Sequence, residues 1–313
     1  MELLYFLENL RTPVGDAFFS LITVLGDETV FILASLPFFW CIDKIQGYYL
    51  MAVGLSGTVI NQFLKLVFRV PRPWVKDPAF TIVESAREAA TGYSFPSGHA
   101  QAAVGTFGGI ARRYQQSWVR VLSIAVSVLV PLSRMYLGVH TPQDVLVSSA
   151  VALVLVFVMY PVVMRMQEKP WGMRVLLGIM ALGAVGLILF SSLYPFPAQV
   201  DADNLAHGVK SGWKMLGCML ALWLAFEVDR RWIRFDTKAV WWAQLLKLAL
   251  GAGILLGIKS GLKPAINALC GGMAVADGVR YFLIVVFAGC IWPLTFRFFA
   301  RLGAKKTDEK TEG

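Results

Sequence analysis

The chain has few charged residues, few histidines and few cysteines, and each shortage excludes a class of protein. Charged residues make up 16% of its 313 residues, whereas a soluble domain has about 25%, so a soluble globular domain is excluded. The four cysteines are widely separated and predict neither a disulfide framework nor a structural metal site. The net charge of +9 comes from basic residues between hydrophobic runs, which argues against nucleic-acid binding.

Hydrophobic segments dominate the rest of the sequence. Hydrophobic residues account for 57% of it, and the mean hydropathy is +0.62. Apolar runs of roughly 18 residues or more recur without the alternation of a barrel strand, which is typical of transmembrane helices. We therefore predict an all-α, polytopic transmembrane helical bundle. Its ten expected spans are residues 13–26, 29–42, 46–68, 98–114, 118–137, 144–164, 173–194, 212–228, 239–258 and 278–300.

The segments outside these spans are predicted to be a loop, a re-entrant segment, an interfacial helix and a disordered tail. A polar loop is expected at residues 73–95. Residues 261–277 are apolar but interrupted by Pro264 and a glycine pair, which indicates a re-entrant segment. The first residues lack the basic region of a cleaved signal peptide, so we expect an interfacial helix that ends at Pro13. The tail at residues 305–313 is charged and is expected to be disordered.

Charge and glycine patterns indicate how the spans are arranged. Ten alternating spans place 11 of the 29 Lys and Arg on one face and the other 18 on the opposite face. The richer face is expected to be cytoplasmic and to hold both termini. The sequence has no N-glycosylation motif, which favours a bacterial plasma membrane. The pairs Gly105/Gly109 and Gly253/Gly257 are candidates for close helix contacts.

Three polar stretches fall on the face with fewer basic residues, and two of the three histidines lie in them. Ionisable groups at the ends of membrane helices are costly unless they meet water or a ligand, so their convergence indicates a functional site. The stretches read Lys65-x6-Arg72-Pro73, Tyr93-Ser94-Phe95-Pro96-Ser97-Gly98-His99 and Ser133-Arg134-x5-His140-x3-Asp144.

The residue types in these stretches suit a bound phosphate. Lys65, Arg72 and Arg134 bring three cations together without a matching cluster of carboxylates, and phosphate oxygens take bidentate contacts from guanidinium groups. Ser97 and Gly98 open a helix, where backbone N–H groups and the helix dipole attract an anion. We therefore expect an anionic phosphate ligand on this face.

The two histidines are candidates for the chemistry itself. His140 and Asp144 are four residues apart, so one helical turn would place the carboxylate beside the imidazole and fix its tautomer. His140 is then the candidate nucleophile that attacks phosphorus, and His99 is the candidate acid for the leaving oxygen. The pattern contains no metal-ligand cluster, so the predicted reaction needs neither a metal nor another cofactor.

The ordered motifs resemble the type 2 phosphatidic acid phosphatase superfamily, which includes lipid phosphate phosphatases, glucose-6-phosphatase and the vanadium haloperoxidases. The resemblance covers residues 65–144 without gaps and implies a six-helix core. It implies a phosphohistidine at His140, oriented by Asp144, with His99 as the general acid. The segment at residues 26–40 also resembles sphingosine-1-phosphate phosphatases. The positions that match phosphate-binding residues of the family are Lys65, Arg72, Ser97, Gly98 and Arg134.

These patterns divide the chain into a six-helix phosphatase core at residues 1–171, about four additional helices at residues 172–304, and the tail. We expect hydrolysis of a lipid phosphomonoester or diphosphate on the extracytoplasmic face, with membrane lipids around the protein. The alternatives are a phosphatase of a soluble sugar phosphate, a haloperoxidase, and a lipid transporter or scramblase without catalysis. His207 falls between two spans and is expected to be an ordinary loop residue.

Overall fold

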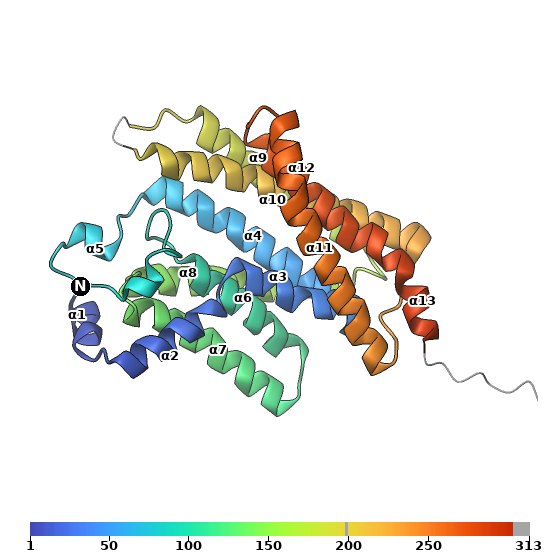
Figure 1. The fold of residues 1–313 in the computed structure, drawn as a ribbon, viewed down its shortest axis with the longest axis horizontal. Coiled ribbons are helices and arrows are strands. Elements are labelled where there is room, and N and C mark those ends of the chain that lie inside the picture. The colour runs from blue at the N-terminus through green and yellow to red at the C-terminus, as the bar shows by residue number, and fades with distance from the viewer. Residues whose placement is uncertain (198–199, 303–313) are drawn as a thin grey trace, which may run out of the picture.

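The computed structural model describes residues 1–197 and 200–302, and every regular element in these ranges is a helix (Figure 1). The all-α prediction is therefore confirmed, whereas the tail at residues 305–313 lies outside the described residues. In chain order the α-helices are α1 (Glu2–Asn9), α2 (Pro13–Val24), α3 (Glu28–Pro37), α4 (Lys44–Phe68), α5 (Pro73–Lys76), α6 (Gly98–Arg113), α7 (Ser117–Tyr136), α8 (Pro142–Met164), α9 (Pro170–Leu193), α10 (Ala202–Val228), α11 (Trp241–Leu269), α12 (Val275–Val286) and α13 (Phe296–Arg301).

Six segments within the described residues are long and apolar enough to cross a membrane, which confirms a multi-pass protein. The predicted spans at residues 13–26 and 29–42 correspond to the shorter apolar helices α2 and α3, and α3 continues into a π-helical turn at Phe38–Ile42. The six segments are Lys44–Lys76, Ser117–Tyr136, Pro142–Met164, Pro170–Leu193, Trp241–Leu269 and Val275–Arg301.

Helix α4 is the central element that positions the site. It packs against α6, α8, α9 and α10, and most of its small and aromatic residues are buried. The prediction for Gly105 and Gly109 is confirmed, because a Cβ at Gly109 would come 2.9 Å from the side chain of Leu50 on α4. The prediction for Gly253 and Gly257 is wrong, since a Cβ at either would meet nothing within 4 Å.

Two expectations about the C-terminal half are wrong. Helix α10 begins at Ala202 because the carboxylate of Asp201 caps it, accepting from the N–H of Asp203 at 2.8 Å. His207 therefore lies on a helix and not in a loop. Helix α11 runs through Pro264 to Leu269, so the predicted re-entrant segment is mostly helix. A proline removes one backbone hydrogen bond, which a long membrane helix tolerates.

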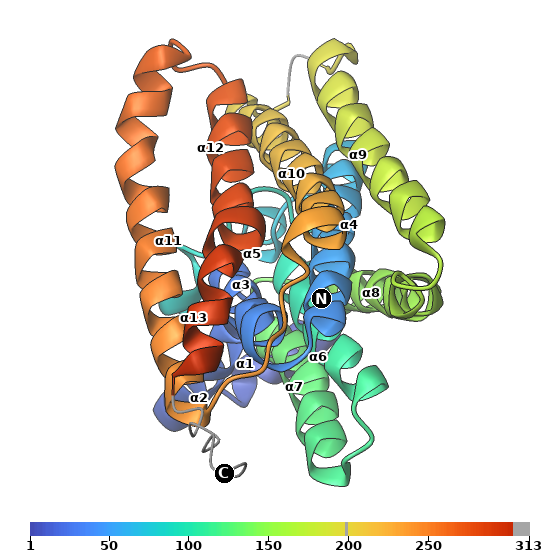
Figure 2. The same cartoon turned by 90° about the vertical axis from the view of Figure 1, so that its right-hand side faces the viewer.

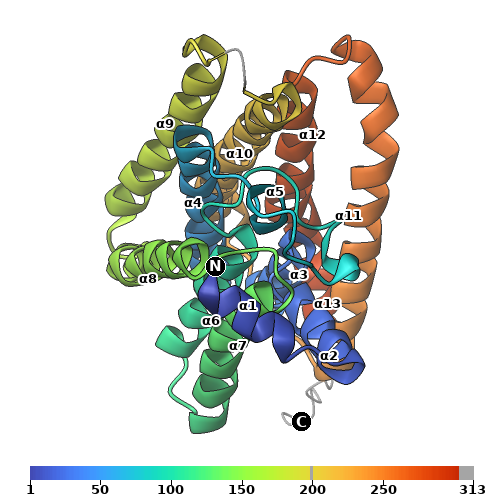
Figure 3. The same ribbon diagram turned by 90° about the vertical axis from the view of Figure 1, so that its left-hand side faces the viewer.

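The N-terminus lies on the face that carries the three motifs, so the prediction of both termini on the opposite face is wrong. The hydroxyl of Tyr5 donates to Asp77 at 2.7 Å, and Nε of Arg11 donates to the carbonyl of Tyr136 at 2.9 Å. Figure 3 looks onto this face, with α1 and α5 toward the viewer. At the opposite face, Asp43 follows α3 and accepts from Arg113 at 3.0 Å, so α2 and α3 cross the bundle together.

Candidate active site

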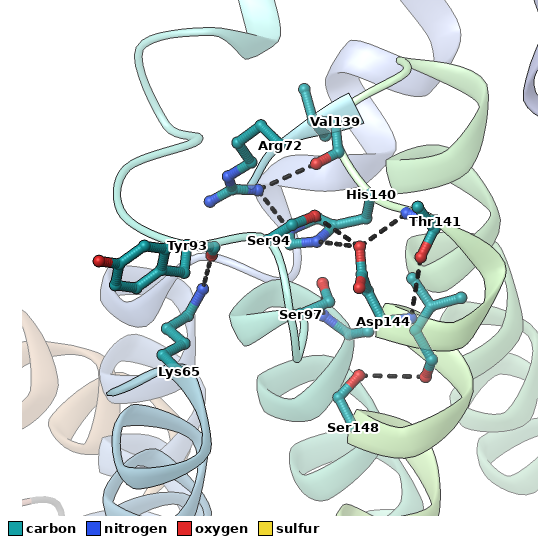
Figure 4. Close-up of polar contacts among 12 residues, drawn as sticks. Lys65, Arg72, Tyr93, Ser94, Ser97, Val139, His140, Thr141, Asp144 and Ser148 are labelled. Atoms are coloured by element: carbon teal, nitrogen blue, oxygen red, sulfur yellow. Dashed lines mark hydrogen bonds and ion pairs between the residues drawn. The ribbon is translucent and has the colours of Figure 1, made fainter. Parts of the chain in front are cut away.

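Three loop–helix junctions bring the predicted site residues together on one face. Lys65 projects from the last turns of α4, Arg72 immediately precedes α5, and His99 lies in the first turn of α6. His140 occupies the short connection between α7 and α8, and Asp144 lies in the first turn of α8. Figure 4 shows how Lys65, Arg72, His140 and Asp144 converge.

The predicted pair of His140 and Asp144 is in contact. Nδ1 of His140 lies 3.4 Å from Oδ2 of Asp144, and both side chains are buried. The same carboxylate oxygen accepts from the backbone N–H of Thr141 at 2.7 Å and from the hydroxyl of Ser94 at 2.6 Å. The hydroxyl of Thr141 in turn accepts from the N–H of Asp144, which completes a capping box at the start of α8. The helix cap therefore fixes the carboxylate that faces the imidazole.

Arg72 contacts the other nitrogen of the same imidazole. Its Nη1 lies 2.9 Å from Nε2 of His140 and 3.0 Å from the carbonyl of Val139. Its remaining donors bond the carbonyls of Gly92 at 3.0 Å and Thr91 at 2.6 Å. A guanidinium can only donate, so Nε2 accepts and the proton of His140 resides on Nδ1. The lone pair of Nε2 thus faces the guanidinium.

The site carries an excess of buried positive charge. Lys65, Arg72 and Arg134 are at most 8% exposed, and their environment includes the single buried carboxylate of Asp144. Lys65 donates to the carbonyl of Tyr93, and Nη1 of Arg134 donates to the hydroxyl of Thr23 at 2.8 Å. In the described part of the chain, Nε and Nη2 of Arg134 have no hydrogen-bond partner. Buried donors without acceptors are rare, and an anion would satisfy them.

Burial and neighbouring cations keep His140 neutral. Burial is the largest cause, followed by the charge of Arg72, and together they lower the pKa of His140 well below its ordinary value of 6.5. The uncharged imidazole has a free lone pair on the ring nitrogen that lacks a proton. His140 is therefore in the form that a nucleophile requires at neutral pH.

A cavity of about 220 Å³ lies between these residues. Three of the predicted site residues, Ser97, Arg134 and Asp144, are not among the residues that line it. The N–H of Ser97 donates to the carbonyl of Asp144 at 3.1 Å. A Cβ at Gly98 would meet nothing within 4 Å, so the backbone is open to a ligand there. The predicted residues that line the cavity are Lys65, Arg72, Gly98, His99 and His140.

Residues to which the sequence analysis assigned no catalytic or phosphate-binding role also form the site. Gly26 packs on His99 so closely that a Cβ there would come 2.8 Å from the carbonyl oxygen of His99, and this contact brings Asp27 to the cavity wall. Asn204 and His207 of α10 complete the wall from the far half of the chain. A short motif cannot reveal such distant partners. Ser94, by contrast, lies inside the second motif stretch and could have been considered as a partner of Asp144.

The side chains of the site are cations and imidazoles, and they do not form a set of metal ligands among the described residues. Within residues 1–197 and 200–302, no three His, Cys, Asp or Glu side chains are grouped as metal ligands would be. The imidazole of His140 is already engaged differently, because it contacts Asp144 and Arg72 through its two nitrogens.

Comparison with protein families identifies the class. The PAP2 superfamily model matches residues 46–168, and the model described as the transmembrane extension of PAP2 superfamily phosphatases matches residues 213–306. Residues 46–168 therefore form a PAP2 superfamily domain, as the motifs predict, and residues 213–306 match the transmembrane extension of such phosphatases. No solved structure matches the chain significantly.

The individual relatives include sphingosine-1-phosphate phosphatases and an undecaprenyl-diphosphatase. Sphingosine-1-phosphate phosphatase 2 of Homo sapiens is 33% identical over 150 residues, which cover 46% of this chain and 36% of the human protein. Undecaprenyl-diphosphatase BcrC of Bacillus subtilis is 33% identical over 112 residues, covering 36% of this chain and 55% of that protein. The chain thus matches about a third to a half of the length of these relatives.

Proposed function

We propose that the protein is a membrane-embedded phosphatase that hydrolyses a lipid phosphate through a phosphohistidine on His140, without a metal ion. The observation that carries this proposal is the arrangement of His140, whose Nδ1 faces Asp144 while its Nε2 faces the guanidinium of Arg72 at the cavity. The names of the relatives support the substrate class, since they include a phosphorylated sphingoid base and a polyprenyl diphosphate.

The proposed reaction has two steps. The lone pair of Nε2 on His140 attacks phosphorus, the bond from phosphorus to the leaving oxygen breaks, and His99 gives that oxygen a proton. A water molecule then attacks the phosphohistidine, transfers its proton to His99 and releases inorganic phosphate. Asp144 stabilises the imidazolium charge that develops on His140 during the first step.

The cations supply the rest of the catalysis. Phosphoryl transfer depends mainly on positioning and on neutralising the charge of the equatorial oxygens. Lys65 and Arg72 line the cavity, and Arg134 has two buried donors without acceptors in the described part of the chain. A bound phosphate would accept from these groups and offset their burial.

Phosphate release from purified protein in detergent tests the proposal. The panel should contain sphingoid-base phosphate, polyprenyl diphosphate, phosphatidic acid and glucose 6-phosphate. We expect release from lipid substrates, full activity in excess chelator, and inhibition by vanadate, which mimics five-coordinate phosphorus. Activity on the sugar phosphate alone would favour the soluble-substrate alternative. Loss in chelator with recovery on adding magnesium would overturn the metal-free mechanism.

The site is proposed to face away from the cytoplasm. Arg112 and Arg113 end α6, and Arg165 follows α8, so basic residues gather at the face opposite the motifs. Lys76→Cys and Lys169→Cys, in a background with the native cysteines replaced by Ala, test this with an impermeant thiol reagent on intact cells. Lys76→Cys should be labelled and Lys169→Cys should not. The reverse pattern would place the site in the cytoplasm.

A further inference from the structure

A second hollow lies beside the catalytic cavity and differs from it in chemistry. It is a groove of about 120 Å³ whose surface is almost entirely apolar. One wall comes from α3 and from α4, the first helix of the PAP2 domain, and the other comes from α10, α11 and α12. Figure 2 shows α11 at the edge of the bundle with α12 beside it. The extension therefore forms half of this groove.

The groove adjoins the catalytic cavity. Phe31 of α3 and Thr58 of α4 line both hollows. The ring of Phe31 lies directly against Gly54, which itself lines the catalytic cavity. The absence of a side chain at Gly54 leaves room for this ring. Phe31 thus stands at the junction between the phosphate-binding cations and the apolar groove.

Polarity changes along the groove. Four polar residues of the groove lie in the half of their helix nearer the face of the catalytic motifs: Thr58 of α4, Lys214 of α10, Lys259 of α11 and Tyr281 of α12. Ser35 of α3 also lines the groove, and its hydroxyl donates to the carbonyl of Phe31 at 2.8 Å. The deeper wall is apolar and consists mainly of Leu36, Phe39, Met51, Leu222, Ala225, Leu255, Ile284 and Ala288. Such a gradient suits a molecule with a polar head at the motif face and a hydrocarbon body directed into the bilayer.

The size of the groove limits what it can hold. Its volume is about 120 Å³, whereas an engineered apolar cavity of roughly 150 Å³ holds a single benzene. The groove follows α10 from Met215 to Ala225, which at 1.5 Å per residue is about 15 Å. A hollow of this volume has room for part of one alkyl chain and none for a second chain beside it.

We propose that this groove, called the chain groove below, holds the hydrocarbon chain of the substrate, and that the protein selects lipid phosphates with one chain over those with two. The proposal rests on the proposed phosphatase function. A chain in the bilayer is already out of water, so the groove gains little from the hydrophobic effect. Its contribution is to fix the chain, and through it the phosphate, in line with Nε2 of His140.

A steric block in the groove tests the proposal. Ala252 of α11 is half-buried and lines the groove, so Ala252→Phe fills it. Ala249→Phe is the matched control, because Ala249 lies on the same helix, is exposed and does not line the groove. The substrates are hexadecyl phosphate, butyl phosphate and dipalmitoyl phosphatidic acid in the same mixed micelles. For the unmodified protein, kcat/KM should be highest for hexadecyl phosphate.

We expect Ala252→Phe to lower kcat/KM for hexadecyl phosphate about tenfold and to leave butyl phosphate within about twofold, with Ala249→Phe unchanged on both. Retained activity on butyl phosphate shows that the variant is folded. An equal loss on both substrates, no loss on either, or a preference of the unmodified protein for dipalmitoyl phosphatidic acid would overturn the proposal. Leu256→Trp, which also narrows the groove, should repeat the result.

A binding experiment separates this proposal from the phosphatase function. His140→Ala protein should be photolabelled by hexadecyl phosphate that carries a diazirine in the middle of its chain. Label on residues 215–225 of α10 supports the groove even if the unmodified protein releases no phosphate from any substrate, an outcome that would overturn only the phosphatase function. Label confined to the exposed surface of α9 would overturn the groove itself.

Discussion

The PAP2 domain and the transmembrane extension meet along α4 and α10, yet they bury different kinds of side chain. On the side of the PAP2 domain the buried set includes Lys65, Arg72 and Arg134 around a polar cavity. The neighbouring part of the extension is mostly apolar. An ion pair between Lys44 and Asp229, at 2.7 Å, joins the two halves on the face away from the motifs. The predicted catalytic residues therefore lie in the PAP2 domain, whereas the extension contributes mainly apolar surface to the proposed chain groove.

Replacing the proposed nucleophile should have the largest effect. His140→Ala removes the atom that attacks phosphorus, so we expect turnover to fall by at least about 10⁴-fold, together with loss of covalent labelling by ³²P substrate. Rapid quench followed by alkaline electrophoresis would measure the label. His207→Ala removes the histidine of the cavity wall that lies outside the motifs, and this variant should keep the covalent label. Label that persists in His140→Ala would place the intermediate on another residue.

The effect of His99→Ala should depend on the leaving group. An alkoxide needs the proton that His99 is proposed to supply, so alkyl phosphates should lose about 10³-fold in kcat. An aryl phosphate, whose leaving group is a weaker base, should lose much less. Plotting kcat against the pKa of the leaving alcohol for both proteins measures this, with a steeper slope for the variant. Parallel plots would exclude His99 as the acid.

Arg134→Lys should be costly although it preserves the charge. Lysine lacks the planar fork, and the two donors of Arg134 that have no partner in the described chain could not both reach an anion. We expect kcat/KM to fall about 10²-fold. Arg120→Lys is the matched control, because Arg120 lies on the same helix and is exposed. An equal, small effect of both changes would argue against a bidentate contact from Arg134.

Asn204 offers a smaller test of whether the extension contacts the headgroup. Its Oδ1 lies 3.5 Å from the position of a Cβ at Gly92, so α10 reaches the loop that holds Arg72. Asn204→Ala should lower kcat/KM about threefold, as expected for one neutral hydrogen bond. Asp203→Asn, which lies next to it outside the cavity wall, should have no effect. If the two variants behave alike, the contact of the extension with the substrate is limited to the chain groove.

The protonation of His140 should not change across neutral pH. Its folded pKa lies below 6.5, so it stays neutral while an unfolded histidine takes up a proton. The unfolded state then binds more protons, and stability falls as pH drops through 6.5. The His99→Asn/His207→Asn variant leaves His140 as the one histidine of the chain, so ¹⁵N chemical shifts report it directly. A titration midpoint at 6.5 or above would contradict this prediction.

The sequence predicted those contacts of the site that join residues close together in the chain. The four-residue separation of His140 and Asp144 predicted their contact because one helical turn determines it, and the capping box that holds it is also local. The long apolar runs predicted helices for the same reason. Lys65 and Arg72 were likewise expected to converge because both flank the end of one span.

Long-range packing explains what the sequence could not provide. The contact of Gly26 with His99 and the approach of Asn204 to the cavity join residues that lie far apart in the chain. Helix α11 continues through Pro264 because lipid offers no hydrogen-bond partners to backbone groups outside a helix. A proline that would end a helix in water therefore does not end this one. The N-terminal helix was placed on the wrong face because its position depends on single contacts such as Tyr5 with Asp77.

The contact between Arg72 and Nε2 of His140 has a consequence for the enzyme at rest. The lone pair proposed to attack phosphorus already accepts a hydrogen bond at 2.9 Å from Arg72, so an attack from Nε2 requires that this hydrogen bond break. An arriving phosphate offers the guanidinium a charged acceptor, which is stronger than a neutral imidazole. We therefore expect a bound phosphate to draw Arg72 away from Nε2 and so to free the lone pair that attacks it. An uncharged electrophile in the cavity should leave the hydrogen bond between Arg72 and His140 in place.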